Sequence, residues 1–387
     1  MRVRFWATVA VVAAVMIGLV VAPARGAATL TQVTGFGSNP GALRMFSYVP
    51  TGLPAGRPLV VALHGCTQNA TGYYTGSGWG KYADLYRAAL IVPEQTSANN
   101  ALSCFNWFTA GDIARGQGEA LSIRQMVAYA VATYGSDPAR VYVTGLSAGG
   151  AMTAVMLAAY PDVFAAGAVI AGLPYNCGTI CQYQAVSRTP AQWGDLVRAA
   201  YPGYSGPRPR VAIWHGTADS TVVPANATEL RDQWTNVHGL PATPTATTTL
   251  PGGTVQENYG TAVQLNRVPG LGHGTPVDPG GAEDQCGTTG AYFLASICSS
   301  FHIARFWGLT VSTPPPSSTP PPSSTPPPAD PECVRASNYA HTVAGRARQA
   351  GGYTYANGSN QAMGLWNVLI TNGLRRTGDN YYVLCQS

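Results

Sequence analysis

Short apolar runs alternate along most of the chain with longer segments in which apolar residues recur at helical spacing. The apolar runs predict strands at residues 43–49, 59–63, 90–93, 141–144, 168–171, 211–214 and 263–268. Helical spacing predicts helices at residues 113–134, 148–160 and 297–307. Short apolar strands that alternate with helices are typical of a mostly parallel sheet covered by helices on both faces.

The segment Val141 to Gly150 joins one of these strands to a helix through a sharp turn. The turn reads Gly145-Leu-Ser-Ala-Gly149, a G-x-S-x-G motif that occurs once in the chain. Between a strand and a helix, this motif predicts a nucleophile elbow, in which small flanking residues allow the strained backbone of the central Ser147. The alternative is a chance match in a chain with 45 glycines.

Polar clusters follow the predicted strands at four places: residues 64–66, 147, 219 and 273. In mostly parallel sheets, functional sites form at the carboxyl ends of the strands. We therefore expect these four clusters to meet at one edge of the sheet.

A serine nucleophile needs a general base, usually a histidine held by a carboxylate, and hydrolases with a nucleophile elbow place them in the order Ser, Asp, His. His273, between two glycines after the last predicted strand, is our candidate base, and an ordinary turn histidine is its alternative. Asp219 follows a buried strand and is our candidate acid, although Asp219 could instead be a helix-capping residue before Pro224.

The oxyanion formed during acyl transfer needs backbone N–H donors. We expect one donor at Ala148, the residue after the nucleophile, and the other at Cys66 in the loop 64–66. His64, in the same loop, and Trp107 are candidate substrate-binding residues. The alternative for Trp107 is a core aromatic residue.

The N-terminus has the features of a secretory signal: Arg2 and Arg4 precede an apolar stretch and the small residues 22–24. A single membrane anchor is the alternative.

The chain has eight cysteines, and an even number fits disulfide formation in an oxidising compartment. The spacing of these cysteines matches no zinc site. We pair Cys333 with Cys385. The pairing of the other six is open, and the simplest set is Cys66–Cys104, Cys177–Cys181 and Cys286–Cys298.

Beyond residue 309 the composition changes to a Ser/Thr/Pro repeat, which predicts a semi-rigid spacer. The segment after it is too short for a large core, so we expect a small module stapled by its disulfide. Its aromatic residues either form its core or bind a surface. They are Tyr339, Tyr353, Tyr355, Trp366, Tyr381 and Tyr382.

The net charge of the chain is +5, but its basic residues form no continuous run, so the charge pattern does not favour a nucleic-acid partner.

These motifs together resemble the extracellular short-chain polyhydroxyalkanoate (poly-3-hydroxybutyrate) depolymerases. The resemblance rests on the segments 63–66, 104–108, 112–119, 145–149, 215–219 and 270–273, and on 336–346 and 356–367 in the C-terminal module. Acetyl xylan and feruloyl esterases share the motifs of the first part. The resemblance implies an α/β-hydrolase-like fold and a domain order of signal peptide (1–26), catalytic domain (27–310), linker (311–331) and polymer-binding module (332–387).

The resemblance further implies a secreted, monomeric serine hydrolase without metal or cofactor, acting on an insoluble polyester. In that mechanism Ser147 attacks the ester, His273 moves the proton, Asp219 orients the imidazole, and the amides of Cys66 and Ala148 hold the oxyanion. After signal cleavage we expect no membrane association. The alternatives are a carbohydrate esterase with a polysaccharide-binding module and, in another class, a non-catalytic polymer-binding protein.

Overall fold

The computed structural model describes residues 29–310, 333–378 and 380–385. The chain forms two compact units, which divide between Thr313 and Pro314. The predicted signal segment 1–26 and the linker 311–331 lie outside the described residues. Within the described ranges, no helix has the length and apolar character that crossing a membrane requires.

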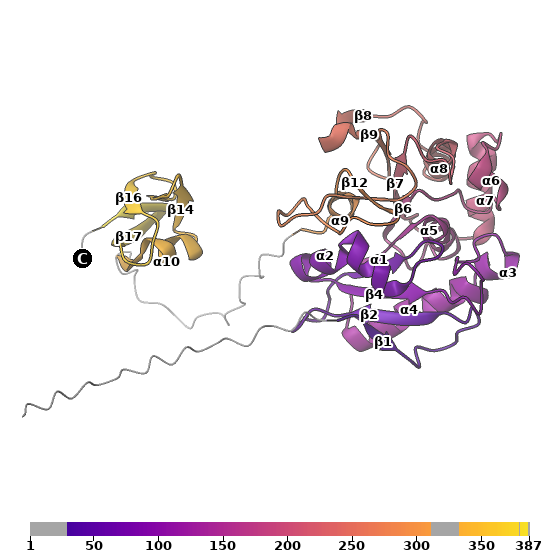
Figure 1. The fold of residues 1–387 in the computed structure, drawn as a ribbon, viewed down its shortest axis with the longest axis horizontal. Helices are drawn as coiled ribbons and strands as arrows, with labels where there is room; N and C mark the ends of the chain where they lie inside the picture. The colour runs from indigo at the N-terminus through magenta and orange to yellow at the C-terminus, as the bar shows by residue number, and fades with distance from the viewer. Residues whose placement is uncertain (1–28, 311–332, 379, 386–387) are drawn as a thin grey trace, which may run out of the picture. The chain divides into compact units, whose positions relative to one another are not determined.

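The first unit is built on one ten-stranded sheet in the order β1-β2-β4-β3-β5-β6-β7-β10-β9-β8 (Figure 1). Six central strands, from β4 to β10 in this order, are parallel, and two antiparallel strands flank them on each side. The strands are β1 (Thr31–Val33), β2 (Arg44–Tyr48), β3 (Leu59–Leu63), β4 (Ala89–Glu94), β5 (Val141–Leu146), β6 (Ala166–Ile170), β7 (Arg210–Gly216), β8 (Ala246–Thr249), β9 (Val255–Tyr259) and β10 (Val263–Val268). This arrangement confirms the predicted mostly parallel sheet.

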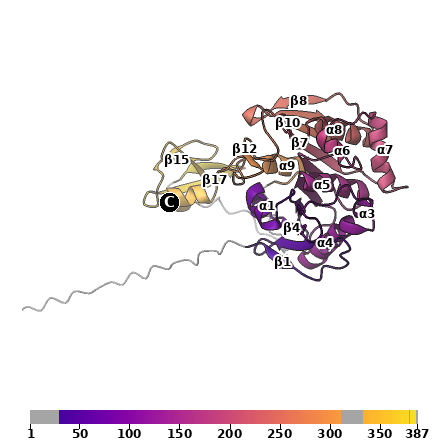
Figure 2. The same ribbon diagram turned by 45° about the vertical axis from the view of Figure 1, so that its right-hand side comes forward.

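Both faces of the sheet are buried, because the central strands β3, β4, β5 and β6 are buried at every position and consist mainly of apolar residues. In β3, Leu59, Val61 and Leu63 enter one apolar cluster, whereas Val60 and Ala62 enter the other. Helices α4, α5, α7 and α8 cover the first face, and α1, α2 and α9 cover the second (Figure 2). The helices of this unit are α1 (Ala70–Ser77), α2 (Trp79–Tyr86), α3 (Ala110–Ile113), α4 (Gly118–Tyr134), α5 (Ala148–Ala159), α6 (Ile180–Tyr183), α7 (Pro190–Ala200), α8 (Ala225–Val237) and α9 (Ser299–Trp307).

Two predicted elements differ from the structure. The helix expected at 113–134 begins only at Gly118, because Ile113 is the last residue of α3 and the turn between the two helices contains Gly116, with a positive φ of 81°. The strand at 263–268 is not the last of the unit, since β11 (Thr275–Val277) and β12 (Phe293–Ala295) form a small parallel pair after it. Each of these strands is only three residues long, and the apolar run at residues 291–295, which contains β12, is a strand signal that our prediction does not use.

The second unit is a small β-rich module with two three-stranded sheets. Its elements are β13 (Val334–Ser337), α10 (Asn338–Val343), β14 (Ala347–Ala350), β15 (Tyr353–Ala356), β16 (Ala362–Leu365), β17 (Thr371–Gly378) and β18 (Tyr381–Leu384). Its apolar core consists of Ala347, Ala356, Met363 and Leu374. Because so small a core stabilises a fold weakly, the Cys333–Cys385 disulfide is an important part of this unit.

Candidate active site

Ser147 lies at a sharp turn between β5 and α5, as the motif predicts. Its φ and ψ are 57° and −117°, a strained conformation for a residue with a side chain. The turn is also tight: a Cβ at Gly145 would lie 2.4 Å from the Gly149 carbonyl oxygen, and one at Gly149 would lie 2.3 Å from the Leu63 carbonyl oxygen. Only glycine fits at either position, so the backbone holds Ser147 at the pocket.

The loops after β7 and β10 bring Asp219 and His273 together. His273 Nδ1 lies 2.8 Å from Asp219 Oδ2, within hydrogen-bond distance. The other oxygen, Oδ1, accepts hydrogen bonds of 2.9 Å from the N–H groups of both Thr221 and Val222. The alternative raised by the sequence, that Asp219 caps a helix, is wrong: Pro224 precedes α8 and no side chain caps that helix, whereas Asp219 Oδ1 caps the turn that follows β7.

His215 is a second histidine at this carboxylate, and sequence reasoning did not assign it a role because it precedes Asp219 in the chain. Its buried Nε2 lies 2.9 Å from the Val222 carbonyl oxygen and 3.5 Å from Asp219 Oδ2. Burial by itself would raise the pKa of Asp219, but hydrogen bonds from His215 and His273 outweigh it, so the pKa of Asp219 is well below its usual range. Asp219 is therefore ionised at neutral pH.

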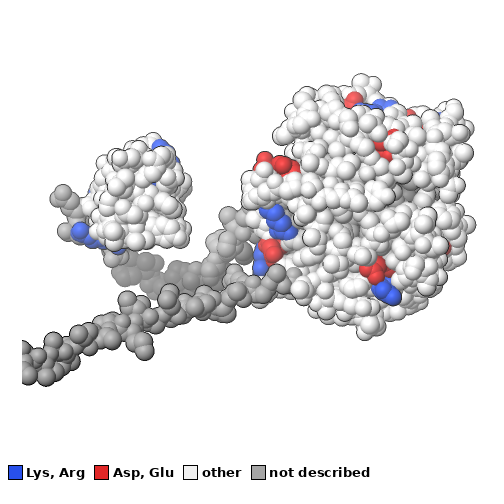
Figure 3. Space-filling view, in the orientation of Figure 1, with Lys and Arg blue, Asp and Glu red and all other residues white. Residues whose placement is uncertain are grey.

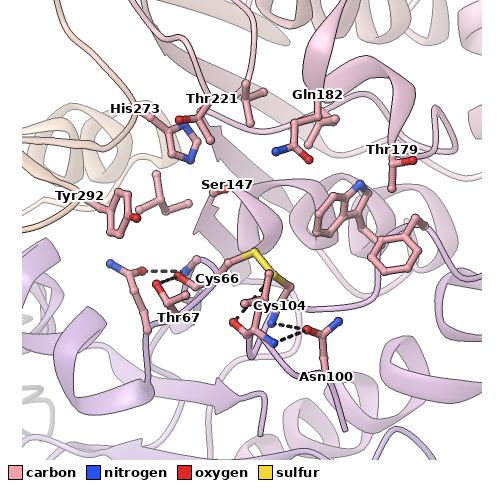
Figure 4. A pocket seen from close by; sticks show the side chains of 18 of the residues that line it. Cys66, Thr67, Asn100, Cys104, Ser147, Thr179, Gln182, Thr221, His273 and Tyr292 are labelled. Atoms are coloured by element: carbon pink, nitrogen blue, oxygen red, sulfur yellow. Dashed lines mark hydrogen bonds between the residues drawn. A yellow bond between two sulfur atoms is a disulfide. The ribbon is translucent and has the colours of Figure 1, made fainter. Parts of the chain in front are cut away.

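The loop 64–66 lies beside the elbow, and Cys66 is joined to Cys104 by a disulfide (Figure 4). Among the described residues, neither the Cys66 N–H nor the Ala148 N–H donates to a protein acceptor. Two unpaired backbone donors beside a serine hydroxyl are the arrangement that an oxyanion needs. All four disulfides of the simplest pairing are present.

The structure does not bring His64 into the pocket, which corrects its assignment as a substrate-binding residue. The side chain is fully buried: its Nδ1 lies 2.8 Å from the Gly65 carbonyl oxygen, and its Nε2 accepts a 3.0 Å hydrogen bond from the Gln95 N–H. Burial lowers the pKa of His64, so the ring is neutral. Gly65 and Cys66 of this loop line the pocket, whereas the His64 ring packs inside the protein behind them.

A pocket of about 350 Å³ opens above Ser147 (Figure 4). Ser147 lies between His273 on one side and the Cys66–Cys104 disulfide on the other. Trp107 lines the pocket and is also largely buried in an apolar cluster, so it has the position expected of a wall residue and that expected of a core aromatic; it packs edge-on against Phe108. Three further groups were not anticipated, since nothing in their local sequence marks them: Tyr292, edge-on to the His273 ring, and Thr179 and Gln182 from the loop and helix at 177–183.

The pocket contains no Lys, Arg, Asp or Glu side chain among the residues that line it. Across the described ranges, no group of three or more His, Cys, Asp or Glu residues is arranged to hold a metal ion. The site thus offers a serine, a histidine paired with a carboxylate, and free backbone donors, which are the groups that serine acyl transfer uses.

Comparison with known proteins gives the same chemistry. Residues 43–258 match the Esterase PHB depolymerase family. The chain is 53% identical to poly(3-hydroxyalkanoate) depolymerase C of Paucimonas lemoignei, over 72% of this chain and 70% of that protein. It is also 39% identical to feruloyl esterase B of Talaromyces stipitatus, over 69% of this chain and 78% of that protein.

Among solved structures, an acetyl xylan esterase from Aspergillus awamori is similar, with a TM-score of 0.60 and 34% identity. The similarity covers 63% of this chain and 94% of that one. The names of these relatives give different substrates, but each relative is named as an esterase or as a polyhydroxyalkanoate depolymerase. The chain therefore belongs to the Esterase PHB depolymerase family and is a carboxylic ester hydrolase.

Proposed function

We propose that this protein is a secreted depolymerase that hydrolyses the ester bonds of a poly-3-hydroxybutyrate-type polyester through a serine acyl-enzyme. The observation that carries the choice of substrate is the apolar, uncharged rim of the pocket. Within residues 29–310, five large apolar side chains are exposed, by 41 to 69%, and they are Leu102, Phe108, Ile180, Tyr183 and Tyr292. Four of the five line the pocket, and Ile180 lies on α6 between two lining residues.

Apolar side chains concentrated around a pocket are typical of an interaction site. An aliphatic polyester is uncharged and water-insoluble, so it can bury this rim without leaving a charge unpaired. The surface in Figure 3 has few charged side chains, in keeping with a chain in which only 10% of residues are charged.

In the proposed mechanism, His273 removes the proton from Ser147 as the hydroxyl oxygen attacks the ester carbonyl carbon. Asp219 holds the imidazole through Nδ1 and stabilises the imidazolium that forms. The backbone N–H groups of Cys66 and Ala148 donate to the oxyanion. His273 then protonates the departing alkoxide of the polymer chain, and a water activated by the same ring releases the acyl group from Ser147.

The C-terminal module supports a polymeric substrate. Its exposed apolar side chains include Tyr339 and Trp366, whose ring centroids are 5.4 Å apart, and Val343, Val368 and Leu369, which are 64 to 85% exposed. We assign these residues to a polymer-binding surface, because a module with so much apolar surface and so small a core is suited to docking on an insoluble material. The linker 311–331 would then keep the catalytic domain close to the polymer.

Four disulfides in the described residues support an oxidising compartment and, with the signal-like segment 1–26, secretion. N-terminal sequencing of the exported protein checks this proposal, and a mature protein that still begins at Met1 would contradict it.

Release of soluble acids from a poly-3-hydroxybutyrate film, compared with release of acetate from acetylated xylan, tests the substrate. We expect activity on the film, absent in Ser147→Ala. Hydrolysis of xylan esters alone would establish the carbohydrate esterase that the feruloyl and acetyl xylan relatives make the second candidate.

A truncated protein that ends at residue 310 tests the module. It should hydrolyse p-nitrophenyl butyrate at the rate of the full chain but adsorb less to the film. Equal adsorption of the two proteins would show that the module has no binding role.

A further inference from the structure

Glu119 is a buried carboxyl group, in the first turn of α4, that the proposed mechanism does not use. Its side chain is fully buried, and none of the ion pairs among the described residues includes it. Burial raises the pKa of Glu119 to about 8, against the effect of a hydrogen bond from the Asn106 N–H. A carboxyl group in such a place destabilises the fold unless it has well-placed donors.

Three donors surround this carboxyl group. Oε1 accepts from the side-chain amides of Gln95 and Asn106, the latter at 2.8 Å, and Oε2 accepts from the Asn106 N–H, also at 2.8 Å. All three come from the irregular segment between β4 and α3, which contributes Cys104 and Trp107 to the pocket. Glu119 is therefore the anchor of a segment that has little regular structure of its own.

One series of contacts runs from Glu119 to the loop 64–66, which contains the Cys66 N–H donor. The Gln95 side chain binds Glu119, and the Gln95 backbone N–H donates to His64 Nε2 at 3.0 Å. The opposite ring nitrogen of His64 lies 2.8 Å from the Gly65 carbonyl oxygen. That carbonyl belongs to the peptide group whose N–H is the Cys66 donor, so the direction of this N–H depends on His64.

A second series of contacts runs from Glu119 to the pocket wall. Asn106 Oδ1 accepts a 2.7 Å hydrogen bond from the Asn100 side chain, and Asn100 Oδ1 accepts from the Cys104 N–H at 3.3 Å. Cys104 is bonded to Cys66, and Trp107 directly follows Asn106. The two series of contacts thus start at one carboxyl group, and they end at the Cys66 N–H and at Trp107 in the lining of the pocket.

We infer that Glu119 is a positioning residue that holds the Cys66 oxyanion donor and the Trp107 wall in register with Ser147. This inference rests on the proposed serine mechanism. Because Glu119 acts through Gln95, His64 and Asn106, it contacts no reacting atom.

The variant Glu119→Gln tests the inference with almost no change in shape. Above pH 8, where Glu119 is ionised, both of its oxygens accept hydrogen bonds, and glutamine replaces one of them by an NH₂ group that faces a donor in either orientation of the amide; the kinetic comparison is therefore made at pH 8.5 to 9. We expect kcat for p-nitrophenyl butyrate, measured per titrated active serine, to fall about 10- to 100-fold, since small displacements of catalytic groups have effects of this size. KM should change less than about threefold, because the ester binds mainly through the rim.

A trifluoromethyl ketone, which forms a tetrahedral adduct with the serine, gives an independent measurement. Its inhibition constant should rise in proportion to the loss of kcat/KM, because the adduct needs the oxyanion donors. A residue needed only for stability would lower the amount of active enzyme but change neither kcat per active serine nor this constant.

Two further variants complete the design. Glu257→Gln, the same change on the strand β9, should have wild-type kcat. Adding Asn106→Asp to Glu119→Gln returns an acceptor opposite the new amide and should recover part of the lost kcat.

Unchanged kcat per active serine and an unchanged inhibition constant in Glu119→Gln would overturn the inference. If that variant does not fold, Asn106→Ala decides by the same two measurements, with smaller expected losses. Because Ser147→Ala tests the serine mechanism separately, failure of the positioning role is distinguishable from failure of the proposed function.

Discussion

Replacing Asp219 by asparagine should inactivate the enzyme through the orientation of a single amide group. Asp219 Oδ1 accepts two backbone hydrogen bonds of 2.9 Å, from Thr221 and Val222. In Asp219→Asn these donors fix the amide oxygen at the Oδ1 position. The NH₂ group must then take the place of Oδ2, 2.8 Å from His273 Nδ1.

An NH₂ group at that place favours the wrong tautomer of His273. The ring accepts a hydrogen bond at Nδ1 and carries its proton on Nε2, so it cannot accept the proton of Ser147. The imidazolium formed during the reaction also loses its carboxylate partner. In serine hydrolases of the Ser-His-Asp type the equivalent change lowers kcat by about 10⁴, which corresponds to about 5 kcal/mol in the activation free energy.

The assay is steady-state hydrolysis of p-nitrophenyl butyrate at pH 7 to 8, with thermal unfolding measured on the same preparations. Asp232→Asn is the matched control, because Asp232 also lies between Ser147 and His273 in the chain but pairs with Arg231 on α8. We expect wild-type kcat in the control. A kcat within tenfold of wild type in folded Asp219→Asn would refute the assignment of Asp219 as the acid.

Three other predictions follow from the same geometry. Folding raises the pKa of Glu119 from 4.5 to about 8, so its contribution to stability is complete below pH 4.5 and is lost as the pH rises through 8. Between these two pH values, the difference in unfolding free energy between wild type and Glu119→Gln should change by up to about 1.4 kcal/mol per pH unit. Denaturant titrations that give the same difference at every pH would contradict this prediction. Replacing Cys66 and Cys104 together by serine should lower the unfolding free energy by about 4 kcal/mol, as expected for a loop of 38 residues, and should also reduce kcat. Replacing Cys333 and Cys385 by serine should leave kcat on soluble esters unchanged. Trp107→Ala should lower kcat/KM for p-nitrophenyl butyrate about tenfold and for the acetate less, since the longer acyl chain reaches further along the wall; equal losses would place Trp107 outside the acyl pocket.

The central strands of the sheet could be predicted because burial on both faces leaves a run of mainly apolar residues, as in Leu59–Leu63 and Val141–Leu146. The edge strand Ala246–Thr249 could not, since all four of its residues are exposed and none is strongly apolar. The split between α3 and α4 was also missed: glycines with positive φ interrupt the helix, but Ile113 continues the apolar spacing across the break.

The candidate site shows the same division. Ser147 could be located from sequence because its strained turn requires glycine at two nearby positions, a steric need that is local to the chain. Asp219 and His273 could be selected by their positions after strands, and the structure places them 2.8 Å apart. His64, by contrast, lies at the end of a strand like the others but points into the protein, which no local pattern indicates.

The sequence by itself therefore determined the features that depend on neighbouring residues: the alternating elements, the elbow, and the segments that end in polar loops. The tertiary structure alone decided which side of a loop faces the pocket, the second histidine at Asp219, the wall formed by Tyr292 and residues 177–183, and the buried Glu119 that joins two loops. These features depend on contacts between residues far apart in the chain. Such contacts exist only once the sheet has brought the ends of its parallel strands to one edge.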